Sequence, residues 1–77
     1  MINVNKLKGK IVENGLSVAE VAEAIGIGTA SLYRKMNGKD ETMYVKDAYA
    51  IEQLLKLTAD DMNTIFFASK VSNMRQD

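Results

Sequence analysis

One segment, SVAEVAEAIGIGTASLYRKMNGK, constrains the fold of this chain more than any other, because it predicts two short helices joined by a tight turn. Ser17 followed by Glu20 is a capping box, a pattern in which side chains satisfy free amide groups at a helix start. Gly26 ends the first helix, because glycine adopts the left-handed conformation that helix C-termini favour. We therefore predict helices over 17–25 and 29–36, connected by residues 26–28.

Each of these two helices has an apolar stripe that faces a core, and the second helix has an unusual outer face. The stripe of the first helix is Val18, Val21, Ala22 and Ile25, and the second helix is anchored by Ile27, Leu32 and Met36. Its outer face carries hydrogen-bonding groups, a cation and a small methyl group, where a helix needed only for packing more often carries Glu and Lys. Such side chains are the ones that read base edges in the major groove of DNA. They are Thr29, Ala30, Tyr33, Arg34 and Asn37.

The spacing of four residues across the turn is that of a helix-turn-helix. Ala22, Gly26, Ile27 and Leu32 follow the pattern A-x-x-x-G-[ILV]-x-x-x-x-[ILV], in which the small Ala lets the helices approach and the aliphatic residues anchor the second one. With the Asn-Gly-Lys that follows, the segment resembles the lambda-repressor-like (Cro/CI, XRE-type) family of phage and bacterial repressors, and is most like a small Cro-type phage repressor. An ordinary helical hairpin is the alternative interpretation.

The resemblance implies an all-α protein, a compact bundle of about five short helices that forms a lambda-repressor-like DNA-binding domain. It implies a transcriptional repressor that binds double-stranded DNA as a homodimer and places the helix from Thr29 to Met36 in the major groove of a palindromic operator. The residues expected at bases are Thr29, Ala30, Tyr33 and Arg34. The residues expected at phosphates are Ser17, Gly28, Ser31, Lys35, Asn37 and Lys39.

Arg34 is the strongest of these predictions, because a guanidinium can donate two hydrogen bonds to guanine O6 and N7, worth about 1–3 kcal/mol of discrimination. One departure from the family lies at Val18, where family members often have a Gln that touches a phosphate. We interpret Val18 as a packing residue, and Ser17 is the expected substitute through its hydroxyl or its backbone amide. Asp40 and Glu41 are expected either to face away from DNA or to limit non-specific binding.

Composition excludes several classes of function. The 77 residues allow one domain, and the chain has no Cys and no His, so the usual zinc ligands and the usual general base are absent. The sequence predicts no enzyme, no cofactor and no metal site. It also has no apolar run long enough to span a bilayer and no apolar N-terminal segment typical of a signal peptide. We therefore expect a cytoplasmic protein, in a bacterium or a phage-infected host cell, without a membrane partner.

The charge distribution is uneven although the formal net charge is +0. Residues 1–39 hold six basic and three acidic side chains, and residues 40–77 hold four basic and seven acidic ones. The positive half contains the two predicted helices, as expected for a DNA-binding face on a neutral molecule. The neutral total favours one alternative, a protein-interaction module such as an antitoxin-type or host-protein-binding phage regulator.

Three further helices are expected around this pair. The first is capped by Asn3 or Asn5 and runs to about Asn14, with lysines at 6, 8 and 10 that are either a solvated face or phosphate contacts. The fourth spans 45–57, and its nearest cap candidate is Thr42. Thr58 with Asp61 is a second capping box, which begins the fifth helix. We interpret Asp60 and Asp61 as capping residues and not as metal ligands.

The three consecutive residues Ile65, Phe66 and Phe67 cannot all face one side of an α-helix. The sequence therefore predicts that the helix ends there or that Phe67 is exposed. We assign residues 1–67 to the DNA-binding domain and 68–77 to a C-terminal tail that is a candidate dimerisation segment. The candidate dimer interface is Phe67, Val71 and Met74.

Overall fold

The computed structural model describes residues 2–38 and 41–67, which form five α-helices and one π-helical turn. The predicted all-α bundle of about five short helices is confirmed, and the described residues contain no strand. No helix among them is long and apolar enough to cross a membrane. The elements are α1 (Val4–Glu13), α2 (Val18–Ile25), α3 (Thr29–Asn37), α4 (Val45–Leu55), α5 (Ala59–Met62) and the π-helical turn η1 (Asn63–Phe67).

The predicted ends of α2 are confirmed. The Ser17 hydroxyl accepts a hydrogen bond from the Glu20 backbone N–H at 3.1 Å, and the Ser17 N–H donates to the Glu20 carboxylate at 2.8 Å. Gly26 has φ 84°, in the left-handed region, and its N–H closes the last turn on the carbonyl groups of Ala22 and Glu23. The chain is thereby turned sharply into α3, whose N-cap is Gly28.

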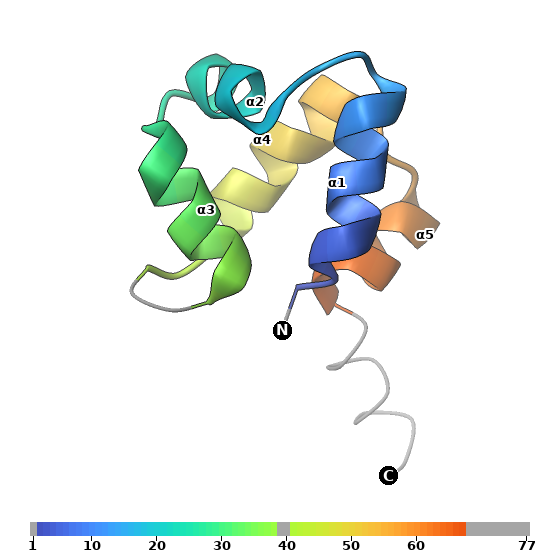
Figure 1. The fold of residues 1–77 in the computed structure, drawn as a ribbon. Coiled ribbons are helices and arrows are strands. Elements are labelled where there is room, and N and C mark those ends of the chain that lie inside the picture. Colours follow the sequence, from blue (N-terminus) through green and yellow to red (C-terminus); the bar gives the residue numbers. More distant parts are fainter. Residues whose placement is uncertain (1, 39–40, 68–77) are drawn as a thin grey trace, which may run out of the picture.

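The core lies between the helices and includes buried residues of every element from α1 to η1. In Figure 1, α1, α2 and α3 lie in front of α4, and α2 packs against both α3 and α4. The predicted apolar stripes supply most of the buried side chains, as the periodicity requires. The fully buried residues of largest volume are Leu7, Ile11, Leu32, Ile51, Ile65 and Val21.

Helix α4 begins at Val45 as predicted, but its N-terminal cap and its last residue differ from the sequence prediction. The helix starts at Val45, and Asp47 stabilises that start by accepting a hydrogen bond from the Tyr44 backbone N–H at 3.0 Å, so Thr42 is not the cap. It stops at Leu55, two residues early, because Lys56 adopts a left-handed conformation with φ 56°. That conformation is strained for a side chain with a Cβ. It directs Leu57 back into the core.

Of the two predicted outcomes for this segment, an exposed Phe67 is wrong, because this side chain is half-buried and packs against the core. The other outcome, an end of the helix at this point, depends on residues that lie outside the described ones. The last described turn is π-helical, with one more residue per turn than an α-helix. Successive side chains are therefore separated by less than the 100° of an α-helix, and Ile65 to Phe67 cover a narrower arc. The Phe66 and Phe67 rings lie 6.2 Å apart and share the contact with the core.

The predicted capping box at Thr58 and Asp61 is confirmed, and the Asp61 carboxylate also forms ion pairs with α1. Asp61 accepts a hydrogen bond from the Thr58 N–H at 3.1 Å, and the Thr58 hydroxyl accepts one from the Asp61 N–H at 3.0 Å. Lys6 and Lys10 of α1 lie 3.7 and 3.5 Å from the same carboxylate. Hydrogen bonding by the Thr58 amide and then by the Thr58 side chain, followed by the Lys10 charge, lowers the pKa of Asp61.

This lowered pKa predicts a loss of stability in acid. A carboxylate with a lower pKa in the folded state stabilises the fold above its ordinary pKa, and that contribution is lost as the pH falls through the folded pKa. We expect the melting temperature to fall below about pH 4, and to fall less steeply in Asp61→Asn. Thermal melts followed by circular dichroism across this range measure both. Asp60→Asn, which removes an exposed neighbouring carboxylate, should keep the wild-type pH profile; an equal flattening in this control would contradict the assignment to Asp61.

Candidate nucleic-acid interface

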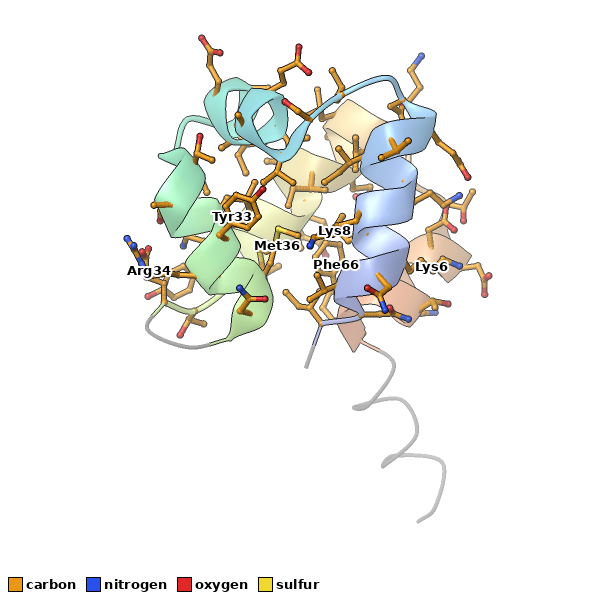
Figure 2. The ribbon with its side chains drawn as sticks, viewed as in Figure 1. Lys6, Lys8, Tyr33, Arg34, Met36 and Phe66 are labelled. Atoms are coloured by element: carbon orange, nitrogen blue, oxygen red, sulfur yellow. The ribbon has the colours of Figure 1, made fainter. Side chains whose placement is uncertain are left out.

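The outer face of α3 carries the four residues predicted to contact bases, and it is open to solvent. All four side chains are exposed, and at 3.6 residues per turn they lie within an arc of about 140° on the helix. Tyr33 is 43% exposed, and the Arg34 side chain is 46% exposed. In Figure 2, Tyr33 points across the front of α3 while Arg34 projects from its outer edge. The opposite side of the helix is anchored in the core by Leu32 and Met36.

The N-terminus of α3 is also open. Gly28 is exposed, and no side chain makes a capping hydrogen bond there, so the helix begins with bare backbone. Amide groups at such a helix start carry partial positive charge and favour anions. At the other end, Asn37 is exposed as the last residue of α3. These positions leave Gly28 and Asn37 free to contact a phosphate.

Lys35 is a correction to the predicted phosphate contacts. It is only 8% exposed, and its ammonium group lies 3.1 Å from the Asp47 carboxylate of α4. The same group donates to the Thr42 carbonyl at 3.0 Å and lies 4.8 Å from the centre of the Tyr44 ring. With three partners inside the fold, Lys35 fastens α3 to the start of α4. It is not available to a phosphate in this arrangement.

Arg34 and Ser31 share a partner that the sequence prediction did not assign to them. The Glu41 carboxylate accepts hydrogen bonds from Arg34 Nε at 2.8 Å and from the Ser31 hydroxyl at 2.5 Å, and Arg34 Nη2 lies 2.8 Å from it. The Ser31 hydrogen bond, followed by that of Arg34, lowers the pKa of Glu41. The Ser31 hydroxyl therefore donates to Glu41 and is not available to a phosphate.

Two predicted phosphate contacts remain, Ser17 and Lys39. The Ser17 backbone N–H is used by Glu20, so only its hydroxyl hydrogen is available to a phosphate. Lys39 lies outside the described residues. Lys8 of α1 is exposed, and in the view of Figure 2 its side chain points from α1 toward α3. The sequence singled out Lys8 only as part of a lysine run.

The candidate dimer surface is described only in part. Phe67 lines an apolar depression between the start of α4 and η1, while Val71 and Met74 lie outside the described residues. Two of the side chains that line it, Tyr44 and Val45 at the start of α4, are exposed. The residues that line it are Ile2, Met43, Tyr44, Val45, Ala48, Phe66 and Phe67.

Glu41 and Asp47 are the site residues that sequence reasoning missed. Each holds a basic residue of α3 from a segment that lies at least seven positions away in the chain. The signal in the sequence was the pairing of Arg34-Lys35 with the acidic residues that follow, but nothing in it shows which acid meets which base. Arg34 is exposed and pairs with Glu41, whereas Lys35 is buried and pairs with Asp47. This difference between the two neighbours is visible only in the folded structure.

Comparison with known proteins adds no assignment. No sequence model of a known family, no curated protein and no solved structure matches this chain.

Proposed function

We propose that this protein is a sequence-specific DNA-binding repressor of the helix-turn-helix type. In this proposal α2 and α3 form the motif, and α3 enters the major groove of double-stranded DNA with Thr29, Ala30, Tyr33 and Arg34 toward the bases. A homodimer would present two copies of α3 about 34 Å apart to the two halves of a palindromic operator. The cytoplasm of a bacterium, or of a phage-infected host, is the compartment that this function requires.

The observation that carries the proposal is the division of α3 into two sides. One side is sealed into the core by Leu32 and Met36 and fastened by Lys35, and the other presents only small, polar, aromatic and cationic groups to solvent. A major groove admits one α-helix and is read through such groups. The sharp turn at Gly26 supports the proposal further, because it places α3 at the edge of the bundle beside α2.

The charges near α3 predict a protein whose DNA binding depends mainly on contacts to bases. With Lys35 buried and Arg34 paired, few cations of the described residues remain to neutralise phosphates near α3. Phosphate neutralisation dominates non-specific affinity, so non-specific binding should be weak and should fall with rising salt. Specific binding must then come largely from contacts to base edges.

Selection of bound sequences from a random duplex library at low salt tests the proposal. Enrichment of a two-fold symmetric site is the expected result and would support both DNA reading and the dimer. Enrichment of one asymmetric half-site would retain DNA reading and reject the dimer. The absence of any enriched site would reject DNA reading.

Replacing Arg34 with alanine should remove the preference for one base position. We expect discrimination there to fall by about 1–3 kcal/mol, because the guanidinium no longer meets guanine O6 and N7. The measurement is a repeat of the selection, followed by anisotropy titrations with the selected duplex and its single-base variants. Lys46→Ala on α4 removes the same charge from an exposed site outside α3 and should keep the preference. If both variants lose affinity equally for all sequences, Arg34 contacts phosphate and not a base.

The second candidate function is a protein-interaction module, and one observation favours it. Three large apolar side chains near the start of α4 are exposed, and exposed apolar patches are often interaction sites. They are Tyr44, Val45 and Tyr49. Measurable duplex binding that weakens as salt rises distinguishes the two functions, because a module for protein partners shows no such binding at moderate salt.

A further inference from the structure

We propose that Glu41 is a specificity-determining residue that orients the Arg34 guanidinium for readout of guanine. The inference rests on the proposed DNA-binding function and assigns a role to a residue outside α3. The inference requires no contact between Glu41 and a base. It acts through Arg34, which it holds from the loop between α3 and α4.

The contact uses one edge of the guanidinium and leaves another edge open. Glu41 Oε1 accepts a hydrogen bond from Arg34 Nε at 2.8 Å. Arg34 Nη2 lies 2.8 Å from the same oxygen. A guanidinium has five N–H groups in a rigid planar fork, so its terminal edge, formed by Nη1 and Nη2, keeps donors that point away from the carboxylate. That terminal edge can donate two parallel hydrogen bonds to guanine O6 and N7.

The carboxylate is itself fixed in place, which a positioning role requires. Its second oxygen accepts the Ser31 hydroxyl at 2.5 Å, one helical turn before Arg34 on α3. Just beyond Glu41 in the loop, the Thr42 carbonyl accepts a hydrogen bond from the buried Lys35 ammonium at 3.0 Å. Glu41 is therefore held both by its side chain and by the anchoring of its neighbour. A fixed carboxylate reduces the number of Arg34 conformations that compete with the one in which the guanidinium contacts guanine.

The negative charge has a second consequence. An unpaired Arg34 would be attracted to any phosphate, which gives affinity without sequence information. Pairing with Glu41 offsets that attraction and places a carboxylate where a phosphate would otherwise sit. Discrimination arises from disfavouring wrong contacts as well as from favouring right ones. Glu41 should therefore lower non-specific affinity and raise the preference for guanine together.

Glu41→Gln in the full chain tests this inference, because the amide keeps the size of the side chain and removes its charge. We expect the preference for guanine at the Arg34 position to fall about tenfold, and affinity for a random duplex to rise about two- to threefold. Selection from a random library and anisotropy titrations with matched duplexes give the two numbers. Glu52→Gln is the control, because it removes one negative charge at a site on α4 and not near Arg34. It should change neither the preference for guanine nor the affinity for a random duplex.

A double-mutant cycle shows whether Glu41 acts through Arg34. In the Arg34→Ala background, Glu41→Gln should have no further effect on base preference. In the free protein, the Arg34 Nε–H resonance should be protected from exchange with water in the wild type and should lose that protection in Glu41→Gln. If Glu41 only stabilised the loop, Glu41→Gln would lower the melting temperature but would not change base preference, whether or not Arg34 is present.

The outcomes separate this inference from the proposed function. If the wild type enriches a site and Glu41→Gln keeps the full preference, the orienting role is wrong while DNA reading stands. If Glu41→Gln binds the selected site more than tenfold tighter with unchanged preference, Glu41 only sequesters Arg34, and the inference is overturned. If the wild type enriches no site, the proposed function fails and this inference fails with it.

Discussion

Replacing Asp47 with alanine should destabilise the fold by about 3 kcal/mol, because it leaves the Lys35 ammonium buried without its counter-charge. The two groups lie 3.1 Å apart, and each side chain is only 9% exposed. Asp47 also accepts the Tyr44 N–H at the start of α4, so its loss frays that helix as well. In a domain of this size the melting temperature should fall by about 15 °C. Urea and thermal unfolding followed by circular dichroism measure both quantities.

A double replacement provides the control for this prediction. Lys35→Met together with Asp47→Leu removes both charges and retains apolar volume, so it should recover most of the stability that Asp47→Ala loses. Asp47→Asn can still accept the Tyr44 N–H and should fall between Asp47→Ala and the wild type. If Asp47→Ala costs less than about 1 kcal/mol, water reaches the Lys35 ammonium and the pair behaves as a surface ion pair.

Replacing Leu32 with alanine should cost about 3 kcal/mol through the cavity that it leaves. Leu32 is 0% exposed and is the main apolar anchor of α3. Its loss should therefore loosen the helix that carries the proposed base contacts as well as the core. Equilibrium unfolding in urea gives the free energy, and hydrogen exchange should show α3 amides opening first. DNA affinity should fall for every sequence without a change in base preference.

The matched control lies on α1. Val12 is 72% exposed, so Val12→Ala should change the free energy of unfolding by less than about 0.5 kcal/mol. If Leu32→Ala and Val12→Ala have similar effects, the core does not pack around α3 in the way described. If Leu32→Ala alters base preference and not overall affinity, α3 itself has shifted in register.

The features that were predictable from sequence depend on residues close together in the chain. A cap needs only Ser17 and Glu20 three positions apart, and the end of α2 needs only Gly26. The apolar stripes likewise repeat within one helix, so the buried sides of α2 and α3 followed from their spacing. The exposed face of α3 was predictable for the same reason, since it is the side opposite Leu32 and Met36.

The features that were missed depend on pairings across the chain. Lys35 and Arg34 are neighbours with the same charge, yet Lys35 is buried with Asp47 and Arg34 is exposed with Glu41. Helix periodicity places them on different sides of α3 but does not say what packs there. The narrow arc of Ile65 to Phe67 was missed for another reason, because the period of a π-helical turn differs from the period assumed.

The backbone bond between the Asn3 N–H and the Ile65 carbonyl, 2.8 Å long, joins the first helix to the last described turn. It means that α1 does not complete its packing until residue 65 has been synthesised. Leu7 and Ile11 share their buried cluster with Met62 and Ile65, which the ribosome adds more than fifty residues later. The domain therefore acquires its fold only after nearly all of its described residues have left the ribosome, and a stalled or prematurely ended chain exposes the face that α1 would bury.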